Sequence, residues 1–143
     1  MSRRRPAVRR IIPPDPEYKD LELARFINRV MQRGKKTTAQ RIIYNAFDII
    51  REQSSREPLE VFQQAVRNAT PQVEVKPKRV GGATYQVPTE LRRERSEALG
   101  MRWLIRGARA RKGMPMRRGL ALELIEASRG EGSAVRRREE LHR

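Results

Sequence analysis

The chain has 143 residues, a length typical of one domain, and its 33 Lys and Arg against 17 Asp and Glu give a net charge of +16. It contains no cysteine, which excludes disulfides, thiolate zinc sites and cysteine nucleophiles. No apolar run is long enough for a transmembrane helix or for the core of a secretory signal. These values indicate a soluble intracellular protein that binds a polyanion and does not bind a membrane.

The excess positive charge is concentrated in three stretches. Residues 1–13 contain five Arg and no acid, residues 76–95 contain six basic and two acidic residues, and residues 102–118 contain seven basic residues and no acid. A solvated helix face would explain any one of these runs. Three of them in one small chain favour a nucleic acid, because clustered cations neutralise backbone phosphates.

We expect a mainly α fold, a single domain over residues 1–143 with five or six helices in a bundle, one protruding β-hairpin and an extended basic N-terminal arm. The arm covers residues 1–16 and ends in prolines that prevent an earlier helix start. Apolar residues at helical spacing predict three helices after it. Their expected ends are Asp20 and Gly34 for the first, Thr37 or Thr38 as the cap of the second, and Ser54 or Ser55 with Pro58 at the start of the third, which Pro71 stops.

The apolar period changes to two between residues 72 and 88, on either side of the pair Gly81 and Gly82. This pattern predicts a β-hairpin inserted between the third and fourth helices. Because an isolated hairpin is only marginally stable in water, we expect it to project from the helices and to be ordered mainly by a partner. Tyr85 could either stack on a base or pair across the strands.

Three more helices follow the hairpin. The fourth begins after Glu90, closes at Lys112-Gly113 and presents an arginine face made of Arg95, Arg102, Arg106 and Arg109. Trp103 on this helix is expected to pack against the core, with stacking on a base as the alternative. The fifth helix begins at Met114-Pro115 and stops at Gly130, and Ser133 is the expected cap of a sixth, from Ala134 to Arg143.

The sequence contains few residues that are arranged to act as catalytic groups. The only histidine is His142, next to the last residue, and no cluster has metal-ligand spacing, so we expect no catalytic residue, no metal site, no cofactor and no small-molecule substrate. The stretch Gly34-Lys35-Lys36-Thr37 resembles the end of a P-loop, but the first glycine of that motif is replaced by Arg29. Two lysines at a helix start instead suit a backbone phosphate.

Cations spread over an arm, a loop, a hairpin and a helix suit a large folded RNA better than one groove of duplex DNA. An architectural or regulatory DNA-binding protein is the first alternative, and preference for duplex DNA over structured RNA would favour it. An RNA-modifying enzyme is the second alternative, which turnover by the purified chain would favour.

Four segments resemble the universal, bacterial-type family of small-subunit ribosomal protein number seven. They are DLELARFINRVMQRGKKTTAQRIIYNA at residues 20–46, TPQVEVKPKRVGGATYQVP at 70–88, ALGMRW at 98–103 and GSAVRRREELHR at 132–143. The resemblance covers nearly the whole chain in order, and RVGGATYQVP is highly specific. The family continues past the final His-Arg with a longer helix and an aromatic tail, whereas this chain stops at Arg143.

The resemblance implies a structural protein that binds the 3′ major (head) domain of small-subunit ribosomal RNA and begins assembly of the head, in a cytoplasmic or organellar ribosome. It also implies a hairpin beside the exit-site tRNA and the mRNA, neighbouring head and platform proteins as partners, and translational repression of the protein's own message. The residues implied in ribosomal RNA contact are Arg3, Arg4, Arg5, Arg9, Arg10, Lys35, Lys36, Lys76, Lys78, Arg79, Arg102, Arg109, Arg111, Lys112, Arg117 and Arg118. The hairpin residues implied near tRNA and mRNA are Arg79, Val80, Gly81, Gly82 and Tyr85.

Overall fold

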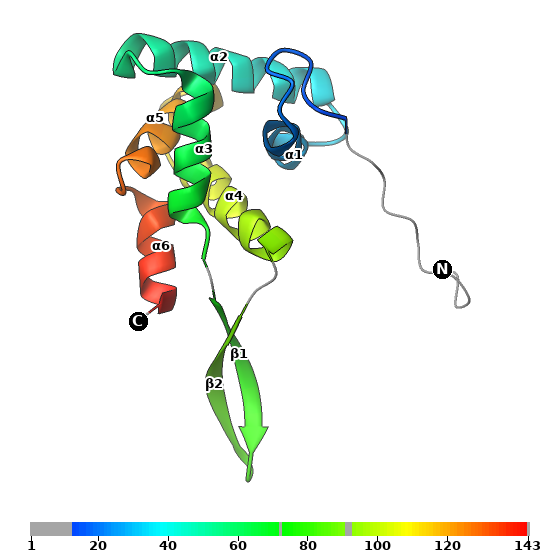
Figure 1. The fold of residues 1–143 in the computed structure, drawn as a ribbon, viewed down its shortest axis with the longest axis vertical. Helices are drawn as coiled ribbons and strands as arrows, with labels where there is room; N and C mark the ends of the chain where they lie inside the picture. Colours follow the sequence, from blue (N-terminus) through cyan, green and yellow to red (C-terminus); the bar gives the residue numbers. More distant parts are fainter. Residues whose placement is uncertain (1–12, 72, 91–92, 143) are drawn as a thin grey trace, which may run out of the picture.

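The structure is a computed structural model that describes residues 13–71, 73–90 and 93–142. These residues form six helices and two strands (Figure 1). In chain order they are α1 (Leu21–Val30), α2 (Lys36–Ser54), α3 (Pro58–Ala69), β1 (Val73–Val80), β2 (Ala83–Glu90), α4 (Arg93–Arg109), α5 (Met116–Ser128) and α6 (Ser133–His142). The prediction of a mainly helical fold is confirmed.

The first helix begins where the sequence predicts and ends earlier. Asp20 is the N-cap of α1, and its Oδ1 accepts a hydrogen bond from the backbone N–H of Leu23 at 2.8 Å. The predicted end at Gly34 is wrong, because Met31 already leaves the helical region with ψ 134°. Arg33 and Gly34 both have positive φ, 55° and 72°, and they form a tight turn into α2.

The predicted caps of the second and third helices are also wrong. Both errors arise because α2 extends beyond the apolar residues from which it was predicted. It begins at Lys36, which places Thr37 and Thr38 inside its first turn. It ends at Ser54, and Ser55 is its left-handed C-cap with φ 56°. The third helix therefore starts after both serines, with Pro58 at its first position.

The later boundaries shift by a few residues. The fourth helix ends at Arg109, before the predicted Lys112-Gly113, and α5 begins at Met116 rather than at Met114-Pro115. Ser133 is the first residue of α6 rather than a residue preceding it. Its hydroxyl donates to the Glu123 carboxylate at 2.6 Å, an interaction that joins α6 to α5.

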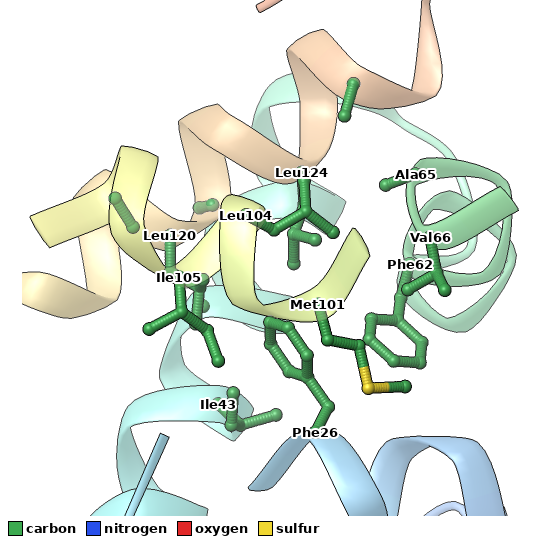
Figure 2. Packing of buried hydrophobic residues seen from close by; sticks show 14 of the residues in the cluster. Phe26, Ile43, Phe62, Ala65, Val66, Met101, Leu104, Ile105, Leu120 and Leu124 are labelled. Carbon is green, nitrogen blue, oxygen red and sulfur yellow. The ribbon is translucent and has the colours of Figure 1, made fainter. Parts of the chain in front are cut away.

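One apolar core is shared by the helices (Figure 2). Phe26 of α1 meets Phe62 of α3 edge to face, with ring centroids 5.1 Å apart, and both side chains are fully buried. Met101 and Leu104 of α4 are buried in the same cluster. Trp103 is half-buried and packs against this core, as expected. The helices are thus held by apolar contacts on their inner faces, which leaves the outer faces to carry charge.

The strands β1 and β2 pair antiparallel, with Val73 opposite Glu90 and Val80 opposite Ala83. Gly81 and Gly82 form the turn between them, with φ 58° and 86°. Positive φ at both turn positions is the geometry that two-residue hairpins prefer, and glycine adopts it without steric cost. In Figure 1 the two strands extend away from the helices.

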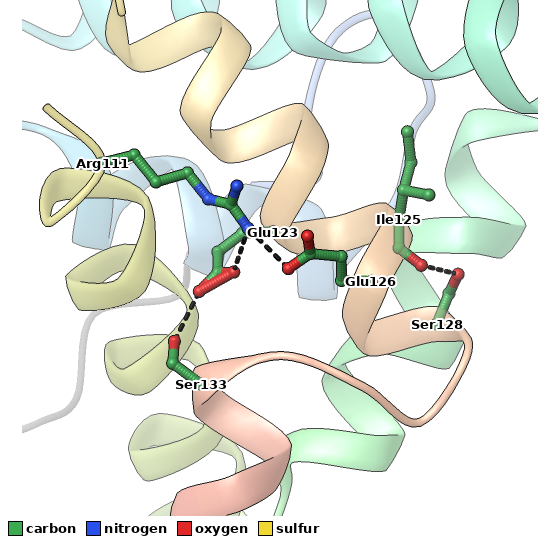
Figure 3. A network of polar contacts seen from close by, with 6 residues as sticks. All are labelled: Arg111, Glu123, Ile125, Glu126, Ser128 and Ser133. Carbon is green, nitrogen blue, oxygen red and sulfur yellow. Dashed lines mark hydrogen bonds and ion pairs between the residues drawn. The ribbon is translucent and has the colours of Figure 1, made fainter. Parts of the chain in front are cut away.

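A buried carboxylate ties the ends of α4, α5 and α6 together (Figure 3). Glu123 of α5 is 3% exposed; its Oε1 accepts from Ser133, and its Oε2 lies 3.2 Å from the guanidinium of Arg111, which also pairs with Glu126. Burial alone would lower the pKa of Arg111, but the bonds to Glu123 and Glu126 outweigh it and raise that pKa. This ion pair fixes the turn after α4 against α5 and α6.

Gly107 of α4 makes room for this carboxylate. A Cβ at position 107 would lie 1.8 Å from Oε1 of Glu123 and 2.5 Å from Oγ of Ser133. Replacing glycine by alanine inside a helix normally stabilises it by about 1 kcal/mol, whereas forcing extra atoms into a packed site costs about 1–3 kcal/mol. At this position the overlap also displaces a buried charge from its partners, so we expect the cost to exceed the gain.

We predict that Gly107→Ala lowers the free energy of unfolding by about 1–2 kcal/mol, measured by urea denaturation followed by circular dichroism. Arg106→Ala is the control, because it leaves alanine at the adjacent exposed position of the same helix without adding any atom near Glu123. An unfolding midpoint of Gly107→Ala equal to or above that of the unmodified chain would contradict the predicted role of Gly107.

Candidate nucleic-acid interface

The arginine face predicted for the fourth helix is exposed. Arg95, Arg102, Arg106 and Arg109 of α4 all lie at the surface, while Met101, Leu104, Ile105 and Ala108 are buried. Residues three or four apart share one face of a helix, so the apolar stripe that enters the core forces the arginines outward. Core packing therefore determines which way this charge points.

A hollow of about 300 Å³ lies between this face and α1, lined by Arg29, Arg102, Ile105, Arg106 and Arg109. Arg29 comes from α1, and the other four come from α4. No carboxylate lines this hollow among the residues that the structure describes. Its chemistry is that of an anion site, since guanidinium groups present several N–H donors in a planar fork that matches phosphate oxygens.

The arginines in the hollow repel one another. Burial lowers the pKa of Arg29, and the positive charges of Arg102 and Arg25 lower it further. Arg25 is itself paired with Glu97 of α4, with 3.6 Å between its Nη1 and the carboxylate. The charged form of Arg29 is therefore held at an electrostatic cost, which a bound anion would remove.

The end of α4 lies beside the end of α1, because Nη2 of Arg109 donates to the carbonyl of Val30 at 3.4 Å. Two of the predicted lysines follow these helix ends in the chain: Lys35 comes five residues after Val30, and Lys112 comes three residues after Arg109. Gly119 lies against α4 as well, since a Cβ there would be 2.9 Å from the Ala108 carbonyl.

Seven of the predicted contact residues lie in or next to the ends of α1 and α4 and the start of α5, and all seven are exposed. They are Lys35, Lys36, Arg102, Arg109, Lys112, Arg117 and Arg118. We call these seven residues, together with Arg29 and Arg106, the basic surface.

Arg111 differs from its neighbours in the predicted set. Its side chain is 25% exposed, and its guanidinium is bonded to Glu123 and Glu126. The structure therefore gives this residue a role in joining α4 to α5 before any partner is present.

The other predicted contacts lie where their side chains are not described. Arg3, Arg4, Arg5, Arg9 and Arg10 are outside the described residues. The backbone of β1 carries Lys76, Lys78 and Arg79, with Lys78 opposite Tyr85 and Arg79 opposite Thr84. Val80, Gly81 and Gly82 follow at the turn.

Arg29 and Arg106 were missed by the sequence prediction of contact residues. Arg29 stands four residues after Arg25 on α1, so the helical period already placed these two cations on one face. The sequence contained no signal that this face meets the arginine face of α4, because that meeting depends on how α1 and α4 pack.

Within residues 13–71, 73–90 and 93–142, no group of three or more acidic or histidine side chains is arranged to hold a metal ion. Over the same residues, no helix combines the length and apolar character that crossing a membrane requires.

Comparison with known proteins identifies a family and several similar proteins. Residues 2–143 match the family described as ribosomal protein S7p/S5e. The small ribosomal subunit protein uS7 of Thermotoga petrophila is 54% identical over 143 residues, covering 100% of this chain and 92% of that protein. The uS7 proteins of Thermotoga maritima and Chloroflexus aggregans are 55% and 53% identical, each over 91% of its own length. The family match and these identities over the full length together show that the chain belongs to the ribosomal protein S7p/S5e family.

Proposed function

We propose that this chain is a structural component of the small ribosomal subunit, which binds the 3′ major domain of the ribosomal RNA directly and begins assembly of the head. The observation that carries the proposal is the hollow between α1 and α4, in which four arginines meet without a carboxylate. Such a concentration of positive charge is favoured most by a partner with closely spaced phosphates.

The chain is not an enzyme, since its family is one of structural ribosomal proteins. The basic surface acts by binding and positioning, and it needs no cofactor for that role. Phosphate contacts of this kind fix the orientation of a protein on RNA without reading its sequence. Specificity for one RNA domain then comes from its shape, because cations on α1, α4 and α5 must all meet phosphates at once.

The hairpin has a separate role in this proposal. With two antiparallel strands and a Gly81-Gly82 turn extending from the helices, it suits a position beside the exit-site tRNA and the mRNA. Neighbouring head and platform proteins are the expected protein partners, and repression of the chain's own message is a further use of the same RNA-binding surface. The expected location is a cytoplasmic ribosome, with an organellar ribosome as the alternative.

The test of the proposed function is a competition between duplex DNA and a head-domain RNA fragment at equal phosphate concentration. We expect the RNA to bind more tightly, because only a folded RNA presents phosphates to several elements from different directions. Preference for duplex DNA would instead support the architectural DNA-binding alternative.

The first prediction concerns the start of α2. Lys35→Glu with Lys36→Glu is expected to weaken binding to the head-domain fragment by about tenfold or more at fixed salt, because two exposed cations become anions facing phosphates. Filter binding measures the affinity and circular dichroism checks that the helices remain. Arg56→Glu with Arg129→Glu is the matched control: α2 has 19 residues and is therefore about 28 Å long, and Arg56 follows its C-terminal end, whereas Lys36 is its first residue. Unchanged affinity of the first variant would refute the assignment.

The second prediction concerns Arg29. Arg29→Gln is expected to raise the melting temperature at low salt, because it removes a cation that Arg102 and Arg25 repel, and to weaken RNA binding. The gain in stability should shrink in high salt, where these repulsions are screened. Calorimetry at two salt concentrations and filter binding measure the two effects.

The control for Arg29 is Arg67→Gln. Arg67 is an exposed arginine of α3 whose positive charge attracts the carboxylate of Glu22, so its loss should not stabilise the fold, and RNA affinity should be unaffected. A fall in both melting temperature and affinity for Arg29→Gln would show that Arg29 supports the fold rather than the anion site.

The third prediction concerns the hairpin. Deleting residues 76–84 is expected to preserve helix content and RNA docking while impairing exit-site functions such as reading-frame maintenance, because the hydrophobic core lies in the helices. Circular dichroism, filter binding and a frameshift reporter measure the three properties. Collapse of helix content on deletion would show that the hairpin is part of the core.

A further inference from the structure

The hollow between α1 and α4 has an apolar base and cationic sides. Arg102, Arg106 and Arg109 stand three or four residues apart on α4, so they share one face of that helix. Arg29 reaches the same hollow from α1. All four arginines are exposed, whereas Ile105, which also lines the hollow, is only 4% exposed. The isoleucine therefore lies at the base of the hollow, and the guanidinium groups form its sides.

The volume of the hollow exceeds what a phosphate group alone would fill. At about 300 Å³ it has room for about ten water molecules, whose share of liquid volume is about 30 Å³ each. This volume lies at the lower end of the range for sites that enclose small organic ligands. Because a phosphate group occupies the space of only a few waters, a larger group can enter the hollow with it.

The lining of the hollow suits a nucleobase although it contains no aromatic side chain among the described residues. Trp103, the aromatic residue of α4, packs against the core instead. The planar guanidinium of arginine stacks on the face of a base, and Ile105 offers an apolar contact that a phosphate could not use. The same guanidinium groups donate hydrogen bonds to phosphate oxygens. The hollow thus offers contacts to both the base and the phosphate of a nucleotide.

The arginines of α4 differ in how far the protein already engages them. Nη2 of Arg109 donates to the carbonyl of Val30, which holds one edge of its guanidinium against the end of α1. Within the part of the chain that the structure describes, Arg102 and Arg106 make no hydrogen bond or ion pair. These two guanidinium groups are therefore the ones whose faces and donors remain for a ligand.

We propose that this hollow binds one unpaired nucleotide of the ribosomal RNA, with its base stacked on guanidinium groups of α4 over Ile105 and its phosphate bonded by the remaining arginines. This inference rests on the proposed function and adds a base contact to it. Bases inside a helix are already stacked on their neighbours, so the nucleotide comes from a bulge, a loop or a strand end. The site then distinguishes an unpaired nucleotide from a paired helix, which phosphate contacts alone do not do.

The test uses a head-domain RNA fragment in which unpaired nucleotides are replaced, one at a time, by abasic residues. An abasic residue keeps the phosphate and removes the base. For the unmodified full chain, we expect one such replacement to lower the affinity by about tenfold in filter binding at fixed salt, as the loss of one stacked base would. If no replacement lowers the affinity, the inference is overturned, because the hollow would then bind phosphate alone.

Arg102→Lys with Arg106→Lys tests whether the base binds in the hollow. Both substitutions keep the positive charge and remove the planar guanidinium. In this variant we expect the effect of the abasic replacement to shrink to about twofold or less, with an unchanged dependence of log K on log salt. Arg136→Lys with Arg137→Lys, at exposed positions of α6 outside the hollow, is the matched control and should retain the full abasic effect.

An abasic effect that persists undiminished in the α4 variant would overturn the inference, because the base would then be recognised elsewhere. Thiouridine at the affected nucleotide gives an independent readout: we expect photocrosslinks to α1 or α4, and crosslinks confined to other elements would also overturn the inference. Circular dichroism and melting temperature check that each variant is folded. Failure of the unmodified chain to bind the unmodified fragment would refute the proposed function itself, whereas tight binding without any abasic effect refutes only the nucleotide site.

Discussion

Apolar packing between α1, α3 and α4 holds together helices whose outer faces repel one another. Phe26 and Phe62 meet edge to face in this core, and Met101 fills the space beside them. The chain carries a net charge of +16, so every cation that the fold brings near another raises the free energy of the compact state. The core has to supply enough stabilisation to hold Arg29 beside Arg102 in the absence of an anion. The basic surface therefore depends on the hydrophobic core.

The few buried carboxylates have a consistent role in this basic chain. Asp15 and Glu123 are both 3% exposed, and each joins several segments: Asp15 connects the N-terminal segment to α2 and to Asp20, and Glu123 connects α5 to Arg111 and Ser133. A buried carboxylate must satisfy its oxygens with donors, so it fixes the geometry of the segments that supply them. The segment that Glu123 fixes through Arg111 continues directly to Lys112, one of the residues proposed for RNA contact.

The basic surface and the hairpin divide the proposed work of the molecule. The surface at the ends of α1 and α4 and the start of α5 offers rigid cations on packed helices, which suits the recognition of RNA shape. Within the described residues the strands of the hairpin pair only with each other, and the hydrophobic core lies in the helices.

The amino-acid sequence by itself determined the helical class, the exposed arginine face of α4 and the absence of thiol chemistry, because these follow from composition and from the period of apolar residues. It placed Pro58 at a helix start correctly, since a proline lacks the N–H that later helix positions need. Helix ends at Gly34, Thr37 and Ser54 were mispredicted, because local capping signals compete with tertiary contacts that the period does not contain.

Only the tertiary structure decided which cations share a surface and which are neutralised. Arg29 joins the arginines of α4 through the packing of two helices far apart in sequence, and no local pattern encodes that contact. Arg111 lies in the same basic run as Lys112, yet its guanidinium is bonded to Glu123 and Glu126. The net charge of a chain is the sum over its residues and can be read from the sequence. The electrostatic field at the protein surface depends on the distances between the charged groups, and those distances are set only by folding.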